Sequence, residues 1–311
     1  MIPDARTPVV VVTGFLGSGK TTLLNKLVSA KKESLVIVNE LGEVGVDHHL
    51  IDHSEERTVA LPNGCLCCRL RGDLEETLIG AAMRRRRGDI AGFDRVLVET
   101  SGLADPGSVA QTLFADQALA RDYKLGPVVT VVDAADAEGR RSSAEIARAQ
   151  IAAADVIVLS KADRTRGLDG VQREIHELNP SVRCIPAAFG EVDPAVLLEA
   201  QTGNDKAFPA AAAHAGGIET FVLRFERPVP RALLERFIAT LVGLRGADLL
   251  RVKGTVPLES GEHVLVQGVR HVFDRLRPVA RGEPALVFIT KQVGRSEIEA
   301  LWHAMAGLVR E

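Results

Sequence analysis

A glycine-rich motif near the N-terminus constrains the fold of this chain more than any other feature. Residues 9–12 are four consecutive valines, and such a run is typical of a strand that is buried on both faces. Directly after it, Gly14, Gly19, Lys20 and Thr21 fill the pattern G-x-x-x-x-G-K-[ST], and leucines at helical spacing follow. This order of strand, glycine-rich turn and helix predicts a loop whose backbone N–H groups bind a chain of phosphates.

Three charged or polar side chains have expected roles at this loop. We expect Lys20 to neutralise the β- and γ-phosphates of a nucleotide and the Thr21 hydroxyl to bind Mg²⁺. Glu99 follows the apolar run 96–98, and a carboxylate at the end of a buried strand needs a partner, which a hydrated Mg²⁺ would supply. Lys20, Thr21 and Glu99 are therefore the predicted catalytic residues. The alternative is that Glu99 ends its strand facing solvent.

Two later segments indicate how the γ-phosphate and the base of a nucleotide would be recognised. Gly102 is placed to offer its backbone N–H to a γ-phosphate and so to report its presence. The segment 160–163, Ser-Lys-Ala-Asp, follows the apolar run 156–159 and looks like the [NST]-K-x-D motif with which GTPases read guanine. Asp163 would accept hydrogen bonds from the N1–H and 2-amino groups of guanine, which adenine lacks, while the Lys161 stem packs on the base. The alternative is ordinary surface polarity.

Three of the four cysteines crowd into one short segment, at Cys65, Cys67 and Cys68. Three thiolates fill three corners of a tetrahedron around Zn²⁺, and soft ligands also suit Cu(I) or Co²⁺. Glu40 is the candidate additional ligand. We expect a transferable or sensed metal ion here; a structural zinc site and thiol chemistry are the alternatives. Cys184 lies in an apolar run and is expected to be an ordinary core cysteine.

Length, charge and hydropathy narrow the class of protein. The chain has 311 residues, which suggests about two domains, and a net charge of -3, which gives no reason to expect nucleic acid or a membrane as a partner. No apolar run reaches transmembrane length, and the first residues lack the hydrophobic region of a signal peptide. We therefore expect a cytoplasmic protein. The arginine run 84–87 is expected to be the solvated end of a helix.

The spacing of apolar runs predicts the architecture. In the first two-thirds of the chain, strand-like runs alternate with helical patterns, which favours an α/β phosphate-loop NTPase domain with a mostly parallel sheet over residues 1–202. Residues 203–217 are rich in alanine and glycine without periodicity and are predicted to be a linker. Strand patterns with two helices over 218–311 predict a smaller α+β domain of ferredoxin-like type.

These features together resemble the CobW-type family of metallochaperone GTPases. The matching segments, in chain order, are GFLGSGKTTLLN from Gly14, NELGEVGVD from Asn39, NGCLCC from Asn63, ETSGLADP from Glu99 and SKAD from Ser160. The resemblance extends more loosely to 250–254 and 264–269 in the C-terminal part. By position, it assigns phosphate and Mg²⁺ binding to Gly17, Ser18, Gly19, Lys20, Thr21 and Thr22.

The resemblance also implies an activity and its partners. It implies GTP binding, slow hydrolysis to GDP, and delivery of a transition metal, Zn²⁺ or Co²⁺, from the cysteine cluster to a client metalloprotein. The C-terminal domain is the candidate surface for that client, and the oligomeric state is left open. Two other functions stay open at this point: a non-catalytic metal sensor or storage protein, and a phosphate-loop kinase with a purely structural zinc.

Overall fold

The structure is a computed structural model that describes residues 5–30, 33–38, 58–60, 69–115, 117–136, 144–198, 213–215 and 217–307. The chain divides into two compact units. Unit 1 contains most of the chain up to Thr202. Unit 2 contains the remainder together with Ile151–Ala153, the end of one helix, and Gln172–Ser181, the larger part of another helix and the residues after it. Each unit has its own sheet and is described separately below.

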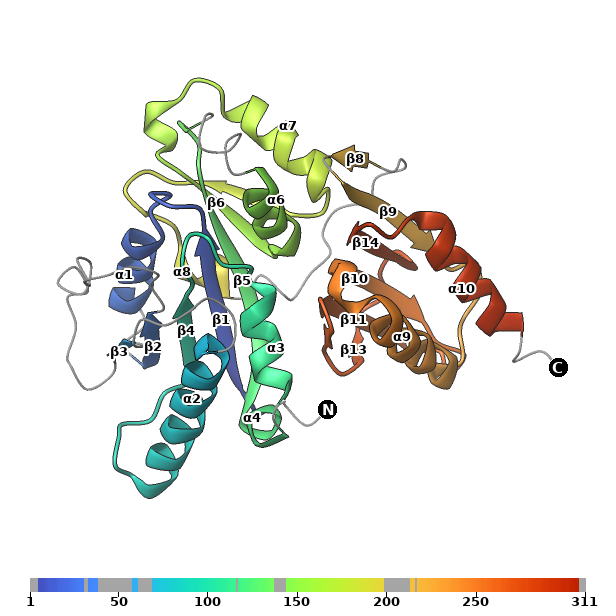
Figure 1. The fold of residues 1–311 in the computed structure, drawn as a ribbon, viewed down its shortest axis with the longest axis horizontal. Helices are drawn as coiled ribbons and strands as arrows, with labels where there is room; N and C mark the ends of the chain where they lie inside the picture. Colours follow the sequence, from blue (N-terminus) through green and yellow to red (C-terminus); the bar gives the residue numbers. More distant parts are fainter. Residues whose placement is uncertain are drawn as a thin grey trace. The chain divides into compact units, whose positions relative to one another are not determined.

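Unit 1 is built on a seven-stranded sheet in which every neighbouring pair is parallel (Figure 1). In sheet order the strands are β3 (Thr58–Ala60), β2 (Ser34–Val38), β4 (Arg95–Glu99), β1 (Thr7–Gly14), β5 (Tyr123–Asp133), β6 (Val156–Ser160) and β7 (Arg183–Pro186). The predicted parallel α/β architecture is confirmed. Because all strands point the same way, the loops after β1, β4, β5 and β6 meet at one edge of the sheet.

Helices connect these parallel strands. They are α1 (Lys20–Ala30), α2 (Arg69–Arg87), α3 (Gly107–Ala115), α4 (Gln117–Asp122), α6 (Ala144–Ala153), α7 (Leu168–Leu178), α8 (Pro194–Leu198) and the short 3₁₀ helix η2 (Ala162–Arg164). The arginine run 84–87 forms the last turn of α2, as predicted. Within it, Arg86 pairs with Asp122 at 2.7 Å and Arg85 lies over the ring of Phe93.

The core of unit 1 explains why β1 and α1 have their sequences. Val10 and Val12 of β1 share one hydrophobic cluster with Leu23 and Leu27 of α1, and each of the four is at most 1 % exposed. Burying side chains of this size contributes about 1.5–3 kcal/mol each. The helix therefore starts from a fixed position at the end of β1. Cys184 in β7 is partly exposed, so the prediction of a core cysteine is corrected: its strand is at the edge of the sheet.

Unit 2 is built on an antiparallel sheet with two main helices, α9 (Arg231–Arg245) and α10 (Arg295–Gly307). Its strands are β8 (Ala213–Ala215), β9 (Ile218–Arg224), β10 (Leu249–Pro257), β11 (His263–Val269), β12 (Val272–Phe273), β13 (Arg277–Val279) and β14 (Ala285–Lys291), and η3 (Gly246–Asp248) is a short 3₁₀ helix. The sheet order is β12-β11-β10-β14-β9-β8, with β13 paired to β11. The prediction of a separate α+β C-terminal domain is confirmed.

Two details of unit 2 differ from the sequence-based expectation. Strand β8 lies inside the range predicted as a linker and pairs antiparallel with β9. The main elements follow in the order β9-α9-β10-β11-β14-α10, so the second helix comes after the last main strand, whereas a ferredoxin-like chain places it before that strand. Both helices still cover one face, where Trp302 packs edge-on against Phe225 and Phe237.

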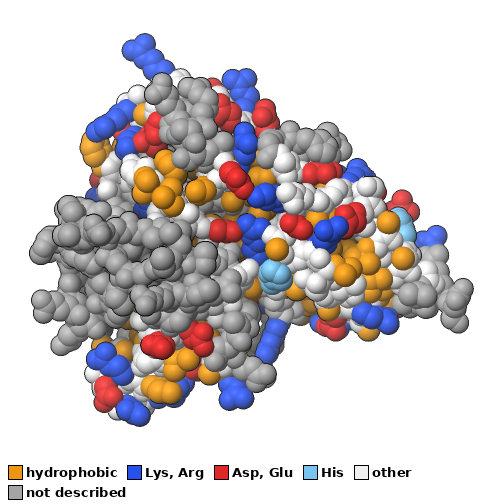
Figure 2. Space-filling view, in the orientation of Figure 1, with side chains coloured by type: hydrophobic (Ala, Val, Ile, Leu, Met, Phe, Trp, Pro, Cys, Tyr) orange, Lys and Arg blue, Asp and Glu red, His pale blue; other side chains and the backbone are white. Residues whose placement is uncertain are grey.

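The described surface carries charges of both signs. Figure 2 shows acidic and basic side chains interspersed over the described part of the face in view, in keeping with totals of 38 Lys+Arg and 41 Asp+Glu in the chain. Among the described helices, none combines the length and the apolar character needed to cross a bilayer.

Candidate functional site

The predicted phosphate loop connects the end of β1 to the start of α1. Its backbone requires glycine at two places. A Cβ on Gly14 would lie 2.2 Å from the carbonyl oxygen of Val131 in β5, and Gly19 has a φ of +95°, which side chains other than hydrogen rarely allow. The loop closes with a hydrogen bond from Ser18 N–H to the carbonyl of Phe15, 3.2 Å long. It lies at the N-terminus of α1, where free N–H groups and the helix dipole favour an anion.

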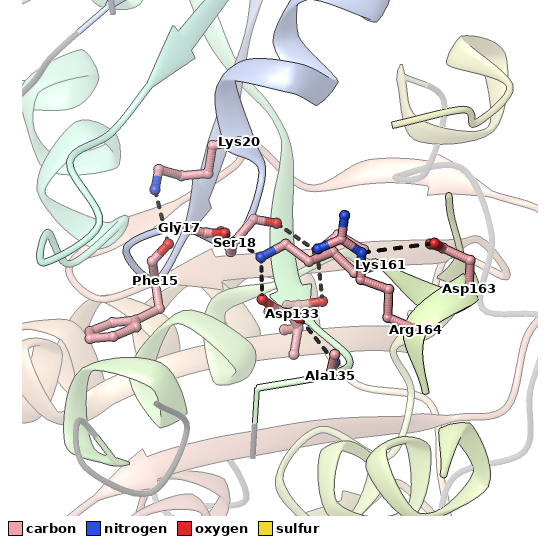
Figure 3. A network of polar contacts seen from close by, with 11 residues as sticks. Phe15, Gly17, Ser18, Lys20, Asp133, Ala135, Lys161, Asp163 and Arg164 are labelled. Carbon is pink, nitrogen blue, oxygen red and sulfur yellow. Dashed lines mark hydrogen bonds and ion pairs between the residues drawn. The ribbon is translucent and has the colours of Figure 1, made fainter. Parts of the chain in front are cut away.

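The first residues of α1 place a cation and a hydroxyl at this loop. The Lys20 ammonium donates a 3.1 Å hydrogen bond to the carbonyl of Phe15, so its charge lies over the loop (Figure 3). The Thr21 hydroxyl donates to Oε1 of Glu99 at 2.8 Å. Thr22, the next residue of the helix, is exposed. The cation and the hydroxyl are therefore both available to a phosphate group.

Glu99 is the last residue of β4 and is only 2 % exposed. Strand register explains its position, because Val12 of β1 is the parallel partner of Glu99 and the next residue, Thr100, bonds through its hydroxyl to that of Thr13 at 2.8 Å. The reading of Glu99 as a solvent-facing strand end is thus excluded. The Thr21 hydroxyl and the Glu99 carboxylate supply the hard oxygen donors that Mg²⁺ prefers, so this pair fits the predicted ion.

Gly102 lies against the phosphate loop, as its predicted role requires. A Cβ at this position would be 2.7 Å from the backbone nitrogen of Leu16. The amide of Gln150, a buried residue of α6, donates to the carbonyls of Gly102 at 3.2 Å and Ala104 at 3.1 Å. Sequence reasoning missed Gln150, because a glutamine inside a helix carries no signal of this contact.

The segment 160–163 is bonded directly to the phosphate loop. The Ser160 hydroxyl donates to the carbonyl of Ser18 at 2.6 Å, and the Lys161 ammonium donates to the carbonyl of Gly17 at 3.0 Å. Asp163 lies in η2 with its side chain 39 % exposed and its Oδ2 atom 4.0 Å from Nε of Arg164 (Figure 3). The side chain of Asp163 is therefore open to solvent, two residues after the lysine that bonds to the phosphate loop.

Asp133 is a further member of this network that sequence reasoning missed. It ends β5, and its Oδ2 atom lies 2.6 Å from Nζ of Lys161, where the two side chains form a partly buried ion pair (Figure 3). The pair holds the Lys161 ammonium between Asp133 and the carbonyl of Gly17. The signal that singled out Glu99, a carboxylate that ends an apolar strand, was also present at Asp133.

The predicted transition-metal ligands Cys65, Cys67, Cys68 and Glu40 lie outside the described residues. Within the described ranges, no cluster of three or more histidine, cysteine, aspartate or glutamate side chains is arranged to hold a metal ion. The described residues therefore include the predicted nucleotide-binding residues and not the predicted transition-metal ligands.

Comparison with known proteins agrees with this geometry. Residues 8–186 match the model of the CobW/HypB/UreG nucleotide-binding domain, and residues 218–306 match that of the cobalamin synthesis protein CobW C-terminal domain. The chain is similar to the zinc chaperone YjiA of Escherichia coli, with 33% identity over 96% of this chain and 98% of that protein. It is also similar to zinc-regulated GTPase metalloprotein activator 1 of Schizosaccharomyces pombe, with 34% identity over 60% of this chain and 47% of that protein.

A solved structure has a similar fold. The crystal structure of Zn(II)-bound YjiA GTPase from E. coli matches with a TM-score of 0.71 at 26% identity, covering 96% of this chain and 99% of that one. The two family matches together span both units. The chain therefore belongs to the CobW/HypB/UreG family of nucleotide-binding proteins and carries the CobW-type C-terminal domain.

Proposed function

We propose that this protein is a GTP-dependent metallochaperone that binds Zn²⁺ at Cys65, Cys67 and Cys68 and passes it to a client metalloprotein. The observation that supports the proposal is the pair of hydrogen bonds from Ser160 and Lys161 to the phosphate loop, since the same short segment carries Asp163, the proposed guanine-binding carboxylate. The relatives named zinc chaperone and zinc-regulated GTPase support zinc as the cargo. Co²⁺ is the second candidate cargo on ligand type.

The residues of the phosphate loop bind and orient the nucleotide. Backbone N–H groups at the start of α1 would bind the phosphates, and Lys20 would balance their negative charge. Thr21 and Glu99 would hold Mg²⁺, which when bound neutralises charge on the phosphates. Asp163 would accept hydrogen bonds from the N1–H and 2-amino groups of guanine, and the Asp133–Lys161 pair keeps the neighbouring backbone in place.

The mechanism of coupling rests on chain order. The cysteine cluster lies between Thr21 and Glu99 in the sequence, and so does Glu40, the candidate fourth ligand. A change in the contacts of these flanking residues on GTP hydrolysis would alter the geometry of the thiolates between them. Thermodynamic linkage then requires the two effects to be equal. Bound Zn²⁺ must change the affinity for GTP by the same factor by which bound GTP changes the affinity for Zn²⁺.

The deciding experiment is a titration of the reduced protein with Zn²⁺, and separately Co²⁺, against a competing chelator. It is run with Mg²⁺·GDP and with Mg²⁺ and a non-hydrolysable GTP analogue. We expect tighter metal binding in the GTP-like state, loss of binding in Cys65→Ser, and no loss in the control Cys184→Ser, whose thiol lies in β7. Equal affinity in both nucleotide states would instead favour storage or a structural zinc.

A second arm tests guanine against adenine. Asp163→Asn replaces one acceptor oxygen by an amide donor, which complements the 2-carbonyl of xanthine and not the 2-amino group of guanine. We expect GDP affinity to fall about 10- to 100-fold and XDP affinity to rise, because hydrogen bonds to a charged group are worth about 1.5–3 kcal/mol. Tight ADP binding by the unaltered protein, with a phosphorylated metabolite as product, would point to a kinase.

A further inference from the structure

A tight turn at residues 188–191 presents an aromatic side chain to solvent. The N–H of Glu191 donates to the carbonyl of Ala188 at 2.9 Å, and both central residues have positive φ, 52° at Phe189 and 73° at Gly190. Phe189 is 71 % exposed, the largest exposed fraction among the large apolar side chains that the structure describes. A left-handed backbone at a non-glycine residue is strained, and an exposed ring offsets little of this strain by packing.

The turn contacts elements of the predicted nucleotide site on both sides. Before it, the N–H of Ala187 donates to the carbonyl of Leu159 at 2.9 Å, and the carbonyl of Ala187 accepts from the N–H of Ala162 at 3.2 Å. Ala162 directly precedes Asp163 in the guanine-reading segment. Phe189 thus lies two residues after Ala187, which is hydrogen-bonded to the residue that precedes Asp163.

The other side of the turn is packed against the start of α1. A Cβ on Gly190 would lie 3.2 Å from Cγ2 and 3.3 Å from the carbonyl oxygen of Thr22, and Glu191 forms an ion pair with Lys26 at 3.6 Å. Thr22 and Lys26 also help to line a hollow of about 420 Å³ along α1, together with Thr21, Asn25 and Ser29. The turn therefore lies between the first turn of α1 and Asp163.

This position brings the turn close to the expected path of a bound nucleotide. Its phosphates would lie on the loop before α1 and its base at Asp163, so the nucleoside would have to pass the turn that carries Phe189. We propose that the ring of Phe189 stacks on the purine base and acts as a binding residue for it. The inference rests on the proposed function for the identity of the base as guanine. Stacking itself is indifferent to which purine is bound, since every base has an aromatic face.

The test compares ligands with and without a base. Phe189→Asn removes the ring while keeping a residue that tolerates the left-handed backbone, so the turn can persist. Mg²⁺·GDP, Mg²⁺·ADP and inorganic tripolyphosphate are titrated by calorimetry into this variant, into Phe189→Trp and into the unaltered protein. We expect Phe189→Asn to weaken GDP binding about 10-fold, within the range for base–aromatic stacking, with little change for tripolyphosphate.

Phe189→Trp gives an independent signal. We expect it to retain most of the affinity for GDP and its added fluorescence to be quenched by GDP and not by tripolyphosphate, measured against the constant background of Trp302. GDP affinity that is the same in Phe189→Asn as in the unaltered protein would overturn the proposal. So would an equal loss for GDP and tripolyphosphate, which would mean that the turn only supports the phosphate loop through Thr22.

The same titrations separate this inference from the proposed function. If the unaltered protein binds ADP as tightly as GDP, guanine reading fails, and the ratio of ADP to tripolyphosphate affinity in Phe189→Asn still decides whether the ring stacks on a base. If GDP is preferred and Phe189→Asn leaves the ratio of GDP to tripolyphosphate affinity unchanged, only the stacking fails.

Discussion

The hydroxyl of Thr21 donates a 2.8 Å hydrogen bond to Oε1 of Glu99, although the two residues are 78 positions apart in the chain. The bond joins the first turn of α1 to the end of β4 at a place where Glu99 is almost fully buried. It exists because β1 and β4 are parallel neighbours, which brings the residue after the phosphate-loop lysine to the carboxyl end of the next strand. The fold thus brings together the two side chains that are predicted to bind Mg²⁺.

Removing the hydroxyl of Thr21 is expected to reduce GTP hydrolysis. Thr21→Ala deletes an oxygen donor for Mg²⁺ and should lower kcat/KM by about 100-fold, because a bound metal ion supplies several kcal/mol of charge stabilisation. Thr21→Ser keeps the hydroxyl and should stay within a few-fold of the unaltered protein. Phosphate release at saturating Mg²⁺ measures both; similar rates for Thr21→Ala and Thr21→Ser would contradict the assigned role.

Asp133→Asn is expected to weaken guanine nucleotide binding. The substitution removes the charge that pairs with Lys161 at 2.6 Å, and the ammonium is then held only by its remaining partners. Loss of a charge-assisted hydrogen bond of this kind should cost about 1.5 kcal/mol, so GDP affinity should fall about 10-fold.

A matched control for this change lies at the other end of the same strand. Asp122 directly precedes β5 and pairs with Arg86 at 2.7 Å, whereas Asp133 ends that strand. Asp122→Asn removes an ion pair of nearly the same length, 2.7 Å against 2.6 Å, at about 36 Å from Asp133 along the chain, given the rise per residue of an extended strand. Fluorescence titration with GDP should show an effect for Asp133→Asn alone; equal effects would rule out a role specific to the site.

Adding one methyl group at Gly102 is expected to damage the site. The Cβ of Gly102→Ala would lie 2.7 Å from the backbone nitrogen of Leu16, so the phosphate loop or the segment after β4 must shift. Overpacking of this kind costs about 1–3 kcal/mol, and we expect both a lower midpoint of urea unfolding and weaker GDP binding.

Gly80→Ala is the control for that substitution. Gly80 lies in α2, and a Cβ there would have no contact within 4 Å. Because alanine favours a helix over glycine, we expect Gly80→Ala to raise the free energy of unfolding by about 0.5–1 kcal/mol and to leave GDP binding as it was. Should Gly102→Ala behave like Gly80→Ala in both measurements, the close contact with Leu16 has no consequence.

Tyr123 is expected to make the free energy of unfolding depend on pH in the alkaline range. Burial raises the pKa of Tyr123 from 10.0 to about 12, and its hydroxyl donates to the carbonyl of Leu78 at 2.9 Å. Between these pH values the unfolded chain releases the phenolic proton while the folded chain keeps it. Stability from this group is therefore complete below pH 10 and is lost as the pH rises towards 12.

The expected loss follows from the size of the shift. About two pKa units correspond to roughly 2–3 kcal/mol of the free energy of unfolding. Tyr123→Phe should lower stability by about 1 kcal/mol at pH 8, because the hydrogen bond to Leu78 is lost, and should remove this part of the pH dependence. Urea unfolding from pH 8 to 11.5 tests this; parallel curves for the two proteins would show that Tyr123 does not titrate as expected.

Local pattern was sufficient to predict the parts of the site that depend on neighbours in sequence. The valine run, the glycines at 14 and 19, and the helical spacing after Lys20 act within about twenty residues, and β1, the loop and α1 follow the predicted order. The alternation of strands and helices likewise predicted the parallel sheet. The roles of Cys65, Cys67, Cys68 and Glu40, which lie outside the described residues, remain predictions.

By itself, then, the sequence determined the phosphate loop, the fold class of both units and the family, because each depends on residue types at short, regular spacing. Only the tertiary structure decided that Asp133 holds Lys161, that Gln150 bonds to the carbonyl of Gly102, and that the exposed Phe189 follows a strand end whose Ala187 bonds to Ala162. These contacts join residues from different strands and helices. Their meeting is set by sheet order and register, and the identities of neighbouring residues in the chain do not encode either one.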